Sequence, residues 1–122
     1  MKIKTSELTG AALDWAVAKC EHTRKRFPYG SPCFDPNTKR VYETEGLRQI
    51  GVNFAPTTNW AQGGPIIERE RISLDADNSP TWLAMGVGGK PCTAGPTPLI
   101  AAMLCFVASR LGNEVDVPKE LL

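Results

Sequence analysis

The segment from residue 98 to 111 constrains the fold more than any other part of this 122-residue chain. Thr97 is a favourable N-cap, Pro98 suits the first helical position, and Gly112 follows Arg110 of the last turn as a stop signal. The apolar positions of this predicted helix cover most of its circumference: Leu99, Ile100, Met103, Leu104, Phe106, Val107 and Leu111. A helix of this kind must be packed on nearly all sides, so we expect it to form the core.

A second helix is predicted from about Gly10 to Cys20. Thr9 is its expected N-cap, and Leu8 and Leu13 occupy the two positions of a hydrophobic staple. The side expected to pack inward carries Leu13, Ala16, Val17 and Cys20, widened by Leu8, Ala12 and Trp15. The side expected to face solvent carries Asp14, Ala18 and Glu21. This helix should pack against the first.

Shorter elements are expected between the two helices. A short helix is predicted from about Pro65 to Arg71, and residues 72–74 and 81–85 have the composition of two strands around a turn. Residues 23–40 are expected to form a long loop. Residues 41–52 fit either a strand or a helical turn, and both alternatives stay open.

Both ends of the chain are expected to be extended, at residues 2–5 and 115–119. Together these patterns predict an α+β fold with one domain, residues 1–122, in which two main helices pack on a short antiparallel sheet with long loops. An apolar content of 42% is enough for a real core. A length of 122 residues is too short for two ordinary domains.

Charge and cysteine usage narrow the classes of partner. The net charge of +1 and the pI near 7.6 make nucleic acid an unlikely partner, because proteins that bind it through charge have a clearly basic face. The cysteines at positions 20, 33, 92 and 105 form no C-x-x-C pair, so a zinc site is not expected. No cofactor is expected either. Reduced thiols in a cytosolic protein are the simplest interpretation. The longest apolar stretch, residues 98–108, is too short to span a bilayer.

Two Gly-Pro junctions, residues 60–67 and 93–100, suggest a binding surface. Each places small residues before an expected helix start, where proline fits and unpaired N–H groups favour an anion. The candidate ligand-binding residues are Trp60, Gly63, Gly64, Pro65, Arg69, Trp82, Lys90, Gly95, Pro96 and Thr97. Arginine and lysine would add charge, and the tryptophans would stack on a base. The competing interpretation is that both junctions are merely capped helix starts and both tryptophans are core residues.

Other candidate features are weaker. His22 has no visible nucleophile or metal partner, so no catalytic residue is predicted. The segment 75–78 faintly resembles a calcium loop but lacks the required glycine and distal glutamate, which favours a plain turn. The basic run 24–26, with Lys39 and Arg40, fits nucleic-acid phosphates or a solvated surface.

Three segments resemble a known family. Residues 5–19 (TSELTGAALDWAVAK), 59–69 (NWAQGGPIIER) and 95–103 (GPTPLIAAM) resemble the opening, middle and end of the NinX-type proteins of lambdoid bacteriophages, a family of unknown function. The resemblance implies a phage accessory protein that works in the host cytoplasm. It brings no established catalytic residues.

The sequence therefore favours a non-enzymatic phage accessory protein. We expect it to bind a small anionic or nucleotide-type ligand and, in the phage setting, to sequester a host antiviral defence signal. An accessory factor in phage DNA metabolism or recombination, and an inhibitor that binds a host protein, remain the alternatives. The apolar content is also compatible with a homo-oligomer formed through a symmetric face. No membrane association is expected.

Overall fold

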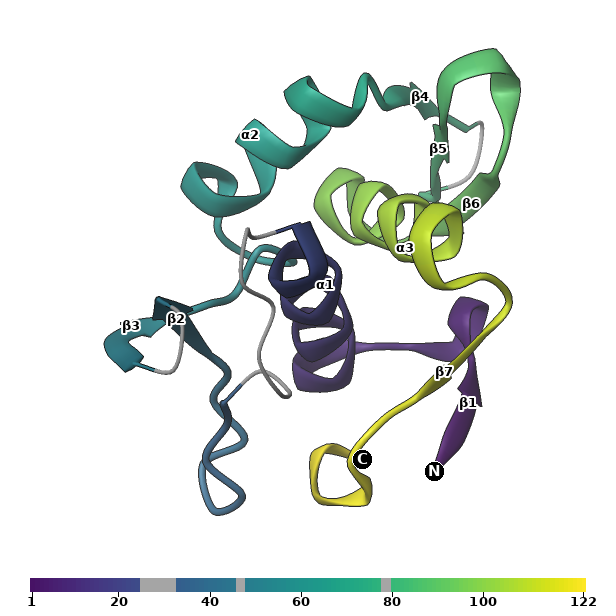
Figure 1. The fold of residues 1–122 in the computed structure, drawn as a ribbon. Helices are drawn as coiled ribbons and strands as arrows, with labels where there is room; N and C mark the ends of the chain where they lie inside the picture. The colour runs from purple at the N-terminus through teal and green to yellow at the C-terminus, as the bar shows by residue number, and fades with distance from the viewer. Residues whose placement is uncertain (25–32, 46–47, 78–79) are drawn as a thin grey trace.

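Helix α3 (Pro98–Leu111) lies at the centre of the fold, as its apolar circumference predicts (Figure 1). The computed structural model describes residues 1–24, 33–45, 48–77 and 80–122, and shows a small α+β fold. The predicted caps of α3 are confirmed: the Thr97 Oγ1 accepts the Ile100 N–H at 3.1 Å, and Gly112 ends the helix with a φ of 81°. The buried residues of α3 are Leu99, Ala101, Ala102, Met103, Leu104, Cys105, Phe106 and Val107.

Helix α1 (Gly10–Arg24) packs beside α3 and extends beyond the predicted end at Cys20. Its predicted inward side is confirmed, and it includes Trp15 and Cys20. Asp14 contradicts the prediction that it faces solvent, since only 8% of its surface is exposed. The physical reason is a partner distant in sequence: the Asp14 Oδ1 accepts the N–H of Thr57 at 3.0 Å.

A three-stranded antiparallel sheet covers another side of α3. It consists of β4 (Ser73–Ala76), β5 (Trp82–Met85) and β6 (Cys92–Gly95) in the order β4-β5-β6. The two predicted strands are confirmed as β4 and β5, while β6 was not predicted. A 3-10 turn, η2 (Val87–Gly89), connects β5 to β6.

The two ends of the chain pair with each other, as Figure 1 shows. Strand β1 (Lys2–Lys4) runs antiparallel to β7 (Glu114–Asp116), which confirms the expected extended ends. Short 3-10 turns, η1 (Thr5–Glu7) and η3 (Lys119–Leu121), follow these strands. This pairing holds the two ends of the chain together next to α3.

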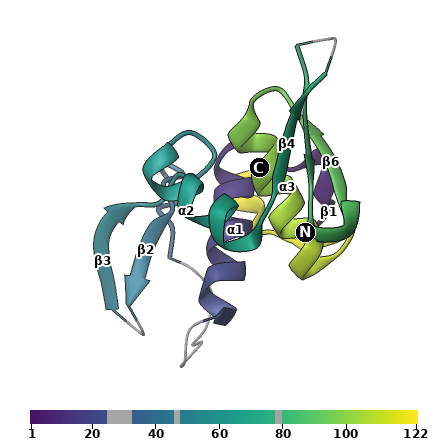
Figure 2. The ribbon, with the colours of Figure 1, turned by 90° about the horizontal axis from the view of Figure 1, so that it is seen from above.

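The ambiguous segment 41–52 contains a β-hairpin. Strands β2 (Tyr42–Glu45) and β3 (Arg48–Asn53) pair antiparallel, and Figure 2 shows them on the opposite side of the helices from β4 and β6. In the segment expected to be a loop, an isolated bridge joins Phe34 to Val41, while residues 25–32 lie outside the described residues.

Helix α2 (Trp60–Glu70) begins earlier than predicted. The prediction of a helix start at Pro65 is wrong, because Asn59 caps the helix and accepts the Ala61 N–H through its side chain at 2.9 Å. Pro65 therefore lies inside α2 and leaves the Ala61 carbonyl without its usual helical donor. In the described ranges, no helix is long and apolar enough to cross a membrane.

Candidate ligand-binding cleft

The starts of α2 and α3 converge on a cleft of about 280 Å³. It is lined by Thr57, Thr58, Trp60, Thr97, Pro98, Leu99 and Ile100. The first residue of one predicted junction, Trp60, thus meets Thr97 of the other. Residues far apart in the sequence form this cleft because α2 packs against the first turn of α3.

Gly63 makes this close approach of the two helices feasible. A Cβ atom at this position would lie 2.6 Å from the Leu99 Cδ2 and 2.6 Å from the carbonyl oxygen of Pro56. Its N–H donates to the Asn59 carbonyl oxygen at 2.9 Å, so it is not one of the free donors expected at a helix start. Gly63 therefore shapes the cleft through packing and offers no amide to a ligand.

Trp60 and Trp82 lie in different environments. Trp60, at the first position of α2, is 55% exposed and lines the cleft. Trp82, on β5, is partly buried and packs against the core. The interpretation that both are core residues is therefore wrong for Trp60, which presents an apolar ring to solvent beside a cavity.

Among the described residues, the cleft is lined by no charged side chain, so helix dipoles are its source of positive potential. Neither α2 nor α3 has an acidic residue in its first turn, so the positive end of each helix dipole is not offset there. Asn59 and Thr97 cap one amide each. Within the described part of the chain, the amides of Trp60 and Leu99 donate to no acceptor. Leu99 is only 3% exposed and Trp60 is 55% exposed, so the amide of Trp60 is the more accessible of the two to an incoming oxygen atom.

Asp14 holds one wall of the cleft in place. Its carboxylate accepts the N–H of Thr57 at 3.0 Å, and Thr57 is only 4% exposed. Burial raises the pKa of Asp14 to about 6, and the hydrogen bonds from Thr57 oppose this rise. The contact ties the segment before α2 to α1.

The elevated pKa of Asp14 predicts a pH-dependent stability. Since the folded protein holds this proton more tightly than the unfolded chain, the extra stability is present below pH 4 and is lost as the pH rises through 6. A shift from 3.8 to about 6 corresponds to about 3 kcal/mol. We expect the difference in unfolding free energy between wild type and Asp14→Asn to change by about this amount between pH 4 and pH 7.

Urea unfolding at several pH values measures this difference, and Glu7→Gln, at an exposed position, is the matched control. If the difference in unfolding free energy between wild type and Asp14→Asn is constant over this pH range, the raised pKa of Asp14 is wrong.

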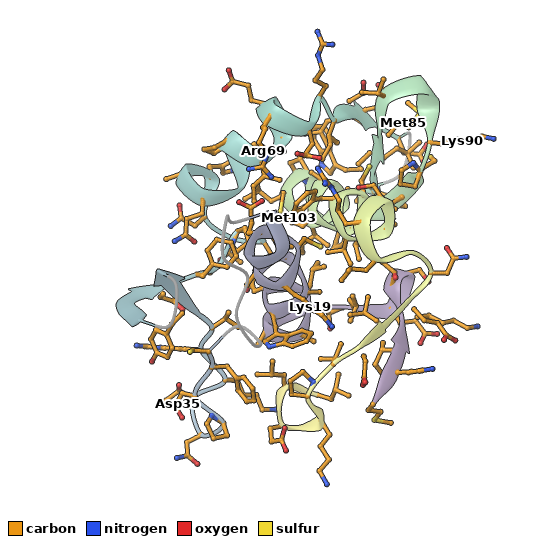
Figure 3. All side chains as sticks on the ribbon, in the orientation of Figure 1. Lys19, Asp35, Arg69, Met85, Lys90 and Met103 are labelled. Atoms are coloured by element: carbon orange, nitrogen blue, oxygen red, sulfur yellow. The ribbon has the colours of Figure 1, made fainter. Side chains whose placement is uncertain are left out.

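The predicted cationic residues lie away from the cleft. Arg69 pairs with Glu21 and with Glu70, and its guanidinium lies 5.5 Å from the centroid of the Phe106 ring. Figure 3 shows Arg69 beside the helices, whereas Lys90 projects outward on the β6 side. Lys90 lines a different cavity of about 370 Å³, together with Glu70 and Arg110 among others. The sequence analysis therefore predicted more positive charge at the site than the structure places there.

The remaining predicted residues also lie outside the lining of the cleft. Gly64 and Pro65 are internal to α2. Gly95 is buried at the end of β6, where a Cβ atom would lie 2.8 Å from the amide nitrogen of Ala101. Pro96 is exposed between β6 and α3. Gly95, like Gly63, therefore allows two backbone segments to lie close together.

The lining residues that were not among the predicted ligand-binding residues are Thr57, Thr58, Pro98, Leu99 and Ile100. An asparagine immediately before Trp60 is the local signal that would have moved the helix start and drawn attention to the two threonines. The segment 75–78 was expected to be a turn, and its first two residues end strand β4. The side chains of His22 and of the basic run 24–26 lie outside the described residues.

The geometry defines a small α+β protein with an uncharged, tryptophan-bearing cleft between two helix starts. The family model described as Bacteriophage P22, NinX matches residues 4–110, and the chain therefore belongs to this bacteriophage family, as the three sequence segments predicted. No curated protein matches the sequence.

Proposed function

We propose that this phage protein binds a small anionic, nucleotide-type ligand in the cleft between α2 and α3 and catalyses no reaction on it. The observation that carries the proposal is the exposed ring of Trp60 in a cleft formed at two helix starts, where the amides of Trp60 and Leu99 donate to no described acceptor. A base would stack on the indole ring, and an oxyanion would accept from the amides. Thr58 is also on the lining; its hydroxyl donates to the Ala55 carbonyl at 3.4 Å, and its oxygen can accept a hydrogen bond from a ligand.

The charge of the cleft favours one class of nucleotide. The lining that the structure describes contains no lysine or arginine, so helix dipoles and neutral donors supply the local attraction there. That arrangement suits a singly charged phosphodiester better than a triphosphate, whose additional charges would lack partners. Cyclic dinucleotides, whose phosphodiester groups each carry one charge, are therefore the ligands to test first, and ADP-ribose derivatives, which carry two adjacent charges, are the comparison.

The chain belongs to a phage family, and a phage gains from a small protein that binds and holds a host signal. Sequestering a host defence signal in the bacterial cytoplasm would require tight binding and slow release, and no chemical step. The proposal thus explains why a cleft with stacking and hydrogen-bonding groups needs no nucleophile or general base.

Calorimetric titration against a panel of cyclic dinucleotides and ADP-ribose derivatives tests the proposal. We expect saturable binding of at least one member, and a loss of about 1 kcal/mol, or roughly fivefold in Kd, for Thr58→Val. Thr81→Val, next to β5, is the control and should bind as wild type does. If no compound binds, the proposal fails, and salt-sensitive DNA binding or capture of a host protein would then support the other two functions.

A further inference from the structure

Strand β6 lies at the edge of the three-stranded sheet, where a further strand could pair with it. It pairs with β5 on one side, and among the described strands none pairs with its other side. Proteins usually protect such edges with charged residues or by covering them. The sequence of β6, Cys-Thr-Ala-Gly, contains no charge, whereas the opposite edge strand β4 carries Asp75.

The register shows which backbone groups of β6 are available. The N–H of Gly86 donates to the Pro91 carbonyl at 3.1 Å, which makes these residues a hydrogen-bonded pair. Because such pairs alternate along antiparallel strands, Thr93 and Gly95 direct their N–H and C=O groups toward β5. Cys92 and Ala94 therefore direct theirs away from the sheet.

These outward-facing groups border a groove of about 460 Å³ between β6 and the paired ends of the chain. Leu104 and Ala108, one turn apart on α3, contribute apolar surface to it. Its single lysine, Lys4, and its single glutamate, Glu114, leave the lining without net charge. The remaining lining residues are Thr5, Ser6, Pro91, Cys92, Thr93, Ala94 and Asn113.

We propose that this groove binds an extended peptide segment of a partner protein, which adds to β6 as a further antiparallel or parallel strand. The outward-facing backbone groups of β6 lie two residues apart, which is about 6.8 Å in an extended strand. A second extended peptide repeats its N–H and C=O groups at the same interval, whereas a small ligand does not. A peptide spanning the four residues of β6 is about 13 Å long. Its side chain that faces α3 is neutral and aliphatic, because it lies over Leu104 and Ala108.

The proposed peptide site is independent of the cleft at α2, since the two share no lining residue. It would let the protein engage a partner chain while its ligand cleft is occupied or empty. Failure of either proposal leaves the other unaffected.

Proline substitution separates strand addition from other binding modes. Ala94→Pro removes an amide that points into the groove without removing a hydrogen bond to β5. Ala76→Pro is the matched control, because Asp77 donates to Thr81 at 3.0 Å and the amide of Ala76 therefore points away from β5 on β4. Both alanines are exposed.

The probe is an array of synthetic heptapeptides that alternate aliphatic and polar residues. We expect wild type and Ala76→Pro to bind a subset of neutral peptides, and Ala94→Pro to bind them at least tenfold more weakly. A bound peptide should also slow alkylation of the exposed Cys92 in wild-type protein, with Cys33 as the internal reference. The proposal is wrong if no peptide binds, if Ala94→Pro binds normally, or if the bound peptide leaves the Cys92 rate unchanged.

Discussion

We expect the Gly63→Ala variant to be less stable than the Gly64→Ala variant, by about 1–3 kcal/mol in unfolding free energy. Both glycines lie inside α2 and gain the same helix propensity on substitution, about 0.5–1 kcal/mol. Only at Gly63 would the new methyl group overlap the Pro56 carbonyl oxygen, at 2.6 Å. At Gly64 the nearest atom, in the Trp60 ring, is 4.0 Å away.

Urea unfolding of the two variants measures this difference directly. The Leu99 Cδ2 is the end of a flexible side chain, but the Pro56 oxygen belongs to the backbone, so α2 would have to move away from residue 56 in the segment that precedes it. We expect Gly64→Ala to equal or exceed wild type in stability. Equal stability of the two alanine variants would show that Gly63 does not lie as close to the Pro56 carbonyl as described.

Removing the Trp60 ring should abolish most ligand affinity. Base stacking on an aromatic side chain contributes about 1–3 kcal/mol, so Trp60→Ala should weaken Kd by about 5- to 150-fold. Trp60→Phe keeps a ring and should recover much of the loss. The midpoint of thermal unfolding should change little in either variant, because Trp60 is 55% exposed and lies outside the core.

Trp82→Phe serves as the control for this effect, since Trp82 packs against the core and lies outside the cleft lining. It should leave Kd unchanged even where it lowers stability. Comparable losses of affinity in the variants at both positions would indicate a general effect on the fold instead of stacking at Trp60.

The elements that local sequence decides were predicted well. Helix α3 carries its cap at Thr97, its proline at the first position and its stop at Gly112, so each signal lies within a few residues of the feature it determines. The strands at residues 73–76 and 82–85 are likewise short runs around a turn. Such patterns need no information about distant contacts.

The errors arise where a distant partner decides the outcome. Pro65 looked like a helix start, but Asn59 caps α2 earlier and the packing of Gly63 on Leu99 and Pro56 accompanies the longer helix. Asp14 looked solvent-facing because its partner, Thr57, is distant in sequence. Strand β6 was missed because its short sequence ends in glycine and gains its register from β5.

The candidate site was predicted in part. Trp60 and Thr97 were both named, and the structure brings them to one cleft. The cations Arg69 and Lys90 were assigned by charge alone, whereas Arg69 pairs with Glu21 and Lys90 lines another cavity. Sequence patterns identify residue types suited to a ligand, but tertiary packing decides which of them meet.

The most direct test of the central claim is a native mass spectrum of the protein purified from infected cells. If the cleft between α2 and α3 holds a phage-relevant ligand, wild-type protein should carry an additional mass in the range of a nucleotide, and Trp60→Ala should lack it. Recovery of bare wild-type protein, or retention of the same mass by Trp60→Ala, would contradict the proposed role of the cleft.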